Sequence, residues 1–106
     1  MKSIMGSEKG VCYLCQKNGL YARKDTECHH VFGGGNRGVC DEDGVTVHLC
    51  RRHHHLCHNG SQSAKLRYML HKEGERKWIE VYGPDILRNG GDPIEEFMKR
   101  YGRNYL

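Results

Sequence analysis

Two pairs of metal-binding side chains, each separated by two residues, constrain how this chain can fold. Cys12 and Cys15 form the first pair, and Cys50 and His53 form the second. Thiolate and imidazole groups bind Zn²⁺ readily, and the two-residue spacing lets both members of a pair reach one ion from a single turn. The spacing therefore predicts a closed, tetrahedral structural zinc site made by these four residues. The Cys57 thiolate is an alternative to His53 as the fourth ligand.

The small size of the chain makes a structural metal ion important for its stability. The sequence has 106 residues, of which only 37% are apolar, and a single domain of this length buries a small core. A zinc ion that binds the folded chain would supply the stability that such a core lacks. We expect a flexible N-terminal tail over residues 1–10 and one domain over residues 11–106.

The cysteines and the apolar residues also indicate the cellular compartment of the protein. Six cysteines in a short exported chain would suggest disulfide bonds, but residues 1–10 contain no apolar stretch of the kind found in a signal peptide. No run of apolar residues approaches the length that crosses a bilayer. We therefore expect reduced thiols, a cytoplasmic location and no membrane partner.

The order of apolar residues predicts a strand, a loop, a second strand and a short helix. Apolar and polar residues alternate over 27–32 and again over 45–49, which is the period of a strand. Residues 33–38 contain four glycines, which would be costly inside a strand or helix, so we expect a loop there. Residues 53–58 are expected to open a short helix.

Two further helices are expected in the second half of the chain. Residues 63–82 have helical spacing, with a weak point at Gly74 and an end at Gly83-Pro84. The last helix begins at Asp92, which can accept hydrogen bonds from free amides at its start. Its buried side is expected to consist of Ile94, Phe97, Met98 and Tyr101.

Four histidines outside the zinc prediction stand at positions suited to chemistry. His29 and His30 are adjacent in a strand, so they point to opposite faces and have different roles: one can coordinate a cation while the other polarises a water molecule. His54 and His58 lie one helical turn apart and can hold a cation from one face. Imidazole is the base whose pKa lies nearest neutrality, and a divalent cation can neutralise the charge on an oxygen that leaves phosphorus.

The remaining histidines and the basic residues have simpler expected roles. His48, His55 and His71 are expected to lie outside the site. Seventeen Lys and Arg against thirteen Asp and Glu give a net charge of +4, which suits contact with a polyanion. Several basic residues flank the proposed site and are expected to bind phosphates. They are Arg37, Arg51, Arg52, Lys65 and Arg67.

Three segments give the chain a family resemblance. The paired Cys12 and Cys15, the adjacent His29 and His30 at a strand end, and Leu-Cys-x-x-His-His at 49–54 opening onto a helix resemble the His-Me finger (HNH) endonucleases. The three segments are residues 29–37 (HHVFGGGNR), 49–54 (LCRRHH) and 101–106 (YGRNYL). Within that superfamily the segments are similar to the phage recombination-enhancement nucleases, which act on DNA together with the bacterial strand-exchange recombinase. The resemblance extends over nearly the whole of residues 11–106.

The resemblance implies a fold, an activity and partners. It implies a small α+β domain with a zinc-stabilised ββα-metal core and additional C-terminal helices, which hydrolyses phosphodiester bonds in DNA. His30 would be the general base, His29 and His54 would bind the catalytic divalent cation, and that cation would be Mg²⁺. DNA and a recombinase filament would be the partners, and the bacterial host cytoplasm would be the location.

The chain departs from the family pattern at two positions, and a second class of function also fits the sequence. Many HNH nucleases have an asparagine between the two strands, whereas Asn36 in the loop is the nearest one here. The phage subfamily places its last histidine several residues after His58, where this chain has Gln62 and Ser63; we retain His58 as a ligand. The alternative function is a non-catalytic zinc module that binds nucleic acid or a protein.

Overall fold

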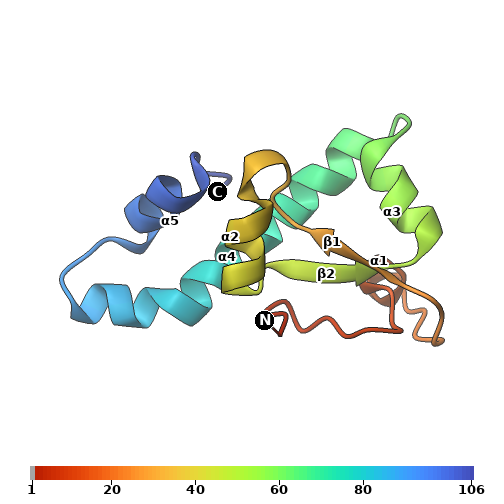
Figure 1. Cartoon of the computed structure of the whole chain (residues 1–106), viewed down its shortest axis with the longest axis horizontal. Coiled ribbons are helices and arrows are strands. Elements are labelled where there is room, and N and C mark those ends of the chain that lie inside the picture. Colours follow the sequence, from red (N-terminus) through yellow and green to blue (C-terminus); the bar gives the residue numbers. More distant parts are fainter. Residues whose placement is uncertain (1) are drawn as a thin grey trace.

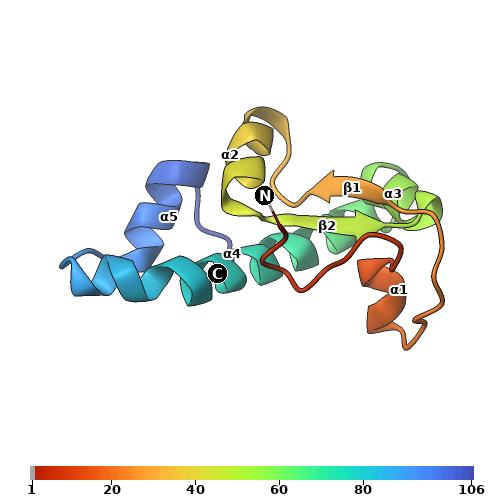
Figure 2. The same cartoon turned by 60° about the horizontal axis from the view of Figure 1, so that its bottom comes forward.

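The computed structural model describes residues 2–106 and has an α+β fold built on a two-stranded sheet and one long helix (Figure 1). Figure 2 shows the strands lying over the long helix, with the first helix below β2. No helix in the described part of the chain is long and apolar enough to cross a membrane. The elements are α1 (Tyr13–Lys17), β1 (Glu27–His30), the 3-10 helix η1 (Gly34–Asn36), α2 (Arg37–Asp43), β2 (Thr46–Leu49), α3 (Arg51–His58), α4 (Ser63–Arg88) and α5 (Pro93–Tyr101).

The sheet confirms both expected strands. β1 and β2 are antiparallel, with Glu27 opposite Leu49 and His30 opposite Thr46. β1 ends at His30, two residues before the expected end; the Val31 amide still donates to the Val45 carbonyl at 3.2 Å, and the side chains of Val31 and Phe32 pack into the core, where they are 2% and 1% exposed. Val47 and Leu49 of β2 belong to the same core cluster as Leu70 and Trp78 of α4.

The glycine-rich segment is more regular than expected. In place of a loop over residues 33–38, the chain forms η1 and then α2, which begins at Arg37. Gly44 ends α2 with a positive φ of 77°, a conformation that glycine adopts without strain. The sequence does not indicate α2 because the helix is short and buries only Cys40 and Asp43, too few positions for a helical period.

Helix α4 runs through the predicted breaks at Gly74 and Gly83-Pro84. Gly74 lies where α4 crosses the end of β1, and a Cβ atom there would be 2.7 Å from Val31 Cγ1. Gly83 lies against Pro93, the first residue of α5, whose Cγ would be 3.5 Å from a Cβ atom at Gly83. The glycines therefore mark close packing of neighbouring elements and not ends of the helix, so the expected end at residue 82 was wrong.

Helix α5 folds back on α4 and begins as expected (Figure 1). The Asp92 carboxylate accepts hydrogen bonds from the amides of Ile94 and Glu95. Phe97 and Tyr101 are buried, but Ile94 and Met98 are 41% and 44% exposed, so the expected buried side was wrong for those two residues. The buried stripe is narrower than expected: α5 packs mainly on α4, and it reaches the end of α2 through Arg100 and Tyr101.

The segment expected to be a flexible tail lies along β2 (Figure 2). The Ile4 amide donates to the Gly44 carbonyl at 2.8 Å, and the Ser7 hydroxyl accepts from the His48 amide at the same distance. Met5 is 7% exposed and belongs to the core. These contacts tie residues 4–7 to the domain.

Asp43 joins three helices in the interior. Its carboxylate accepts hydrogen bonds from Trp78 Nε1 on α4 and from the Tyr101 hydroxyl and the Arg100 guanidinium on α5, at 2.6 to 2.8 Å. Burial raises the pKa of this carboxyl, but the hydrogen bonds from Arg100, Tyr101 and Trp78 outweigh burial and hold the pKa below its usual value. The ionised carboxylate thus fixes α2 against the helical half of the molecule.

Candidate metal centres

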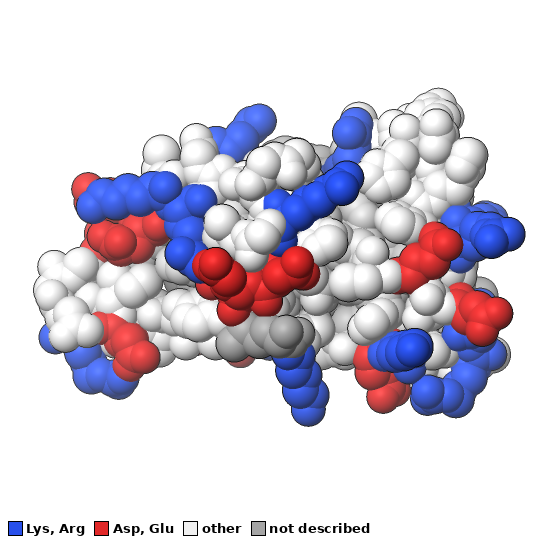
Figure 3. All heavy atoms as spheres, viewed as in Figure 1, with Lys and Arg blue, Asp and Glu red and all other residues white. Residues whose placement is uncertain are grey.

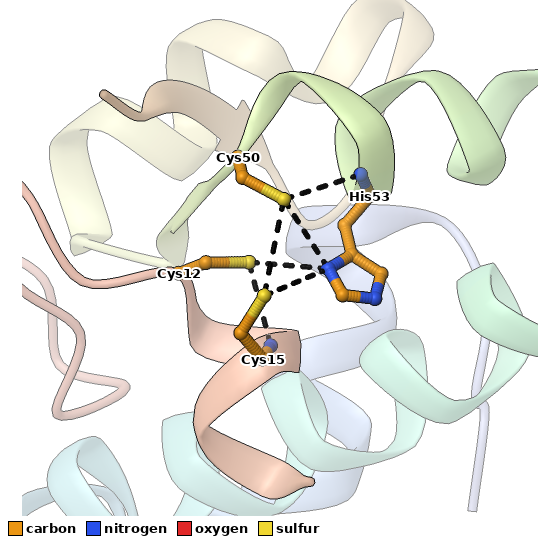
Figure 4. Close-up of side chains that lie close together, drawn as sticks. All are labelled: Cys12, Cys15, Cys50 and His53. Carbon is orange, nitrogen blue, oxygen red and sulfur yellow. Dashed lines mark hydrogen bonds between the residues drawn. The ribbon is translucent and has the colours of Figure 1, made fainter. Parts of the chain in front are cut away.

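The first cluster brings together the four residues predicted to bind zinc. Figure 4 shows the side chains of Cys12, Cys15, Cys50 and His53 converging from α1 and α3. His53 Nδ1 lies 3.3 to 3.4 Å from each of the three sulfurs, and the sulfurs of Cys15 and Cys50 are 3.9 Å apart. Tetrahedral Zn²⁺ with ordinary bond lengths requires about 3.5 Å between sulfur and nitrogen and about 3.8 Å between sulfurs. The spacing of the donor atoms therefore fits a structural zinc ion.

Two helix starts position the sulfurs. Cys12 caps the N-terminus of α1 and accepts a hydrogen bond from the Cys15 amide, while Cys50 caps α3 and accepts one from the His53 amide. The positive end of a helix and a donated N–H both favour thiolate. Burial opposes ionisation of Cys12, but backbone hydrogen bonds at Cys50 and Cys15 outweigh it and lower the pKa of the thiol. In each pair the same turn sets the spacing of the two ligands, and at Cys12 it also favours the thiolate form that binds a metal.

His53 and not Cys57 completes this cluster. Burial lowers the pKa of His53, so the imidazole is neutral at pH 7 and has a lone pair for a metal. Cys57 lies on α3 outside the cluster, is 0% exposed, and has a pKa raised by burial, as expected of a thiol that packs as an apolar side chain. The alternative that Cys57 replaces His53 is therefore wrong.

The second cluster consists of His29 on β1 and the pair His54 and His58 on α3. One nitrogen from each ring lies within 4.8 Å of the others, and the ring centroids are 5.3 to 5.5 Å apart. His29 is 5% exposed, and burial, followed by the neighbouring charge of His54, lowers its pKa to about 4. The ring of His29 is thus neutral at pH 7, the state in which imidazole binds a cation.

The donor set of this second cluster does not fit the Mg²⁺ that the family resemblance implies. Magnesium prefers oxygen ligands in an octahedron, whereas three imidazoles suit zinc and other late transition metals. Three protein ligands also leave a fourth position open, which is the arrangement of catalytic and not of structural zinc sites. The residues therefore fit a transition-metal ion with a free coordination position.

Glu27 orients one of these ligands. Its Oε1 lies 2.8 Å from His54 Nδ1. A carboxylate can only accept, so Nδ1 carries the proton and Nε2 is left with the lone pair for a cation. Histidines that bind metals commonly donate their other N–H to a carboxylate in this way. No local pattern indicates this contact, because 27 residues separate the partners.

His30 has a carboxylate partner of its own. Its Nε2 lies 2.9 Å from Asp41 Oδ1, so Nε2 carries a proton, and in the neutral tautomer the lone pair lies on Nδ1. His30 and the three-histidine cluster line the same pocket of about 600 Å³. The pleat of β1 thus turns His29 toward α3 and leaves His30 at the mouth of the same hollow.

The expected basic residues divide into two groups. Arg37 and Arg67 line the histidine pocket, whereas Arg51, Arg52 and Lys65 are exposed outside it. His55 projects to solvent beside Asn59, as expected for its position on α3. His71 was expected to lie outside the site, but it lines the pocket and stacks on Phe32 at 5.4 Å between ring centroids.

Comparisons with known proteins assign no family or function to this chain. No protein-family model, no curated protein and no solved structure matches this chain.

Proposed function

We propose that the protein is a metal-dependent endonuclease that hydrolyses phosphodiester bonds in DNA. One observation supports this most: three imidazoles with donor atoms within 4.8 Å, and a fourth histidine paired with a carboxylate, share a pocket with two arginines. A structural zinc module needs only the four residues of the first cluster. Such a module does not require the second cluster or its pocket.

The residues of the pocket support distinct roles in hydrolysis: a general base, cation ligands and phosphate-binding groups. His30 Nδ1 accepts a proton from a water molecule as the water oxygen forms a bond to phosphorus. The bond between phosphorus and the sugar oxygen breaks, and that oxygen leaves with the electron pair and takes a proton from solvent. His29, His54 and His58 would hold a cation, which stabilises negative charge on the leaving oxygen. Arg37 and Arg67 would bind the flanking phosphates.

The proposed biological setting follows the resemblance to the phage recombination-enhancement nucleases. The partner would be a recombinase filament on DNA in the bacterial host cytoplasm. The net charge of +4 suits this substrate, because basic residues release counterions when they bind phosphates.

Plasmid cleavage by matched histidine variants tests the proposal. We expect the protein to nick or cut supercoiled DNA with a transition-metal ion, and His30→Ala to reduce the rate by about 10²- to 10⁴-fold while zinc content and melting are kept. His54→Ala should lower the rate and weaken binding of the second cation. His55→Ala is the control on the same helix and should cut at the parental rate. A His30→Ala protein with parental activity would leave the zinc module as the better function.

A further inference from the structure

A second hollow adjoins the histidine pocket on the side of the C-terminus. It measures about 160 Å³ and lies between α4 and the residues that follow α5. Arg67 and His71 line both hollows, so the two hollows are adjacent, and together they are called the trough. The second hollow is lined by Ala64, Arg67, Tyr68, His71, Arg103 and Tyr105.

The trough is positively charged along its length. Arg37 stands at the histidine end, Arg67 in the middle and Arg103 at the far end, and no acidic residue of the described chain lines either hollow. None of these arginines has an ion pair with a carboxylate in residues 2–106, whereas Lys17, Lys77, Arg88, Lys99 and Arg100 all do. Figure 3 shows acidic side chains gathered over α2, with a basic side chain extending across the surface between α2 and α3. Within residues 2–106, the unpaired arginines and the absence of acidic lining residues therefore favour a bound anion.

Aromatic rings accompany the arginines at the far end. Tyr68 is 55% exposed, and Lys72 Nζ lies 4.9 Å from the centre of its ring. Tyr105 stacks on Phe32, with 5.1 Å between ring centroids, and lies tilted against His71 at 4.6 Å. The Arg103 guanidinium lies 4.9 Å from the centre of the Tyr105 ring. The Glu75 carboxyl accepts the Tyr105 amide at 2.6 Å and fixes this residue at the edge of the trough.

Together these features point to an unpaired strand. Exposed aromatic rings beside arginines bind bases by stacking, and bases are available for stacking only where they are not paired within a duplex. We propose that a single strand of DNA runs from the three-histidine cluster along this trough, with phosphates on Arg67 and Arg103 and a base on Tyr68. The proposal rests on the proposed nuclease function for its choice of DNA, and it adds a binding subsite outside the reacting centre.

Binding measurements with single-site variants test the subsite. An oligonucleotide of about 12 nucleotides, labelled with a fluorescent base, is titrated with the His30→Ala protein so that it stays intact, and its duplex is titrated beside it. Tyr68→Ala should weaken binding of the single strand by at least about 5-fold without changing the salt dependence, and Tyr68→Phe should restore it. Arg103→Ala should reduce the slope of log K against log salt by about 0.7, the value for one phosphate contact on a single strand.

Two matched controls and the duplex decide the outcome. Tyr21→Ala removes an equally exposed tyrosine outside the trough, and Arg88→Ala removes one positive charge at the far end of α4; both should bind as the parent does. If Tyr68→Ala binds as the parent does, or if duplex is bound as tightly as the single strand and responds equally to the variants, the proposal is wrong. The nuclease proposal stands or falls separately, because it depends on cleavage by the parental protein.

Discussion

His30 Nε2 donates a hydrogen bond to Asp41 Oδ1 across 2.9 Å, which joins the end of β1 to the middle of α2. Both partners belong to elements whose places are fixed by the core: β1 pairs with β2, and α2 is held by the Asp43 hydrogen bonds. The carboxylate therefore sets the tautomer and the orientation of the proposed base. In the HNH pattern an asparagine between the strands steadies the base, and here Asp41 offers a contact of that kind.

The first prediction concerns Asp41. Asp41→Ala should reduce kcat by about 10- to 100-fold with KM nearly unchanged, because the ring of His30 loses the partner that fixes it. Nitrogen NMR of His30 should show the proton on Nε2 in the parent and a mixture of tautomers in the variant. Glu42→Ala removes a neighbouring charge from α2 without touching His30, so equal losses in the two variants would contradict a positioning role.

The second prediction concerns the zinc cluster. Metal analysis should find one tightly bound zinc per chain, and Cys12→Ser or Cys50→Ser should release it. Losing even about 3 kcal/mol of metal-linked stability lowers the melting temperature by about 12 to 24 °C in a domain of this size. Cys28→Ser, at an exposed position on β1 outside both clusters, should melt as the parent does. An unchanged melting curve after zinc removal would argue against the cluster as a structural site.

The third prediction compares two glycines within helices. At Gly74 a Cβ atom would lie 2.7 Å from Val31 Cγ1 and 3.1 Å from Phe32 Cζ, both on buried side chains that cannot move away. Gly74→Ala should therefore destabilise the protein by about 1 to 2 kcal/mol, since overpacking outweighs the gain in helix propensity. At Gly38 on α2 a Cβ atom meets nothing within 4 Å, so Gly38→Ala should stabilise by up to about 1 kcal/mol.

Urea unfolding of the two glycine variants measures both signs. Opposite changes in the midpoint, at an unchanged slope, are the expected result. A stabilising Gly74→Ala would show that α4 and the end of β1 are not packed as closely as these distances require.

The zinc ligands could be read from the sequence because their chemistry is local. Each pair lies within one turn, and the two-residue spacing alone places both donors on the same side of a helix start. The pair His54 and His58 was also accessible from the helical period. The strand period only separates His29 from His30, and the choice of His29 as the third ligand came from the family resemblance. The partners Glu27 and Asp41 were not accessible, because their contacts depend on how α2 and α3 pack around β1.

The glycines of α4 illustrate a second limit of the sequence. Gly74 and Gly83 lower helix propensity, and local reasoning placed a weak point and an end there. Burial of the helix against Val31, Phe32 and Pro93 outweighs that local cost, and only the packed structure reveals those neighbours. The same holds for α2, whose two inward residues are too few to give a period.

The last prediction concerns Glu75, which is fully buried in α4. Burial raises the pKa of its carboxyl, and the hydrogen bond from the Tyr105 amide offsets only part of that rise. Its second oxygen, Oε2, has no hydrogen-bond partner within residues 2–106. A group whose pKa is higher in the folded state stabilises the protein fully below its ordinary pKa, and that stability is lost as the pH rises through the folded value. Stability should therefore fall as the pH rises above about 4.5, the ordinary value for this carboxyl.

Glu75→Gln keeps the shape and the acceptor for Tyr105 but cannot ionise. It should melt at nearly the parental temperature at pH 4 and above the parent at pH 8, because only the parent must then keep a proton or bury a charge. Glu80→Gln on the exposed side of α4 is the control. Its melting temperature should not rise relative to that of the parent between pH 4 and pH 8. Melting curves of the three proteins across this range give the result. A Glu75→Gln protein that melts below the parent at pH 8 would mean that the carboxylate is ionised and held by a partner other than Tyr105.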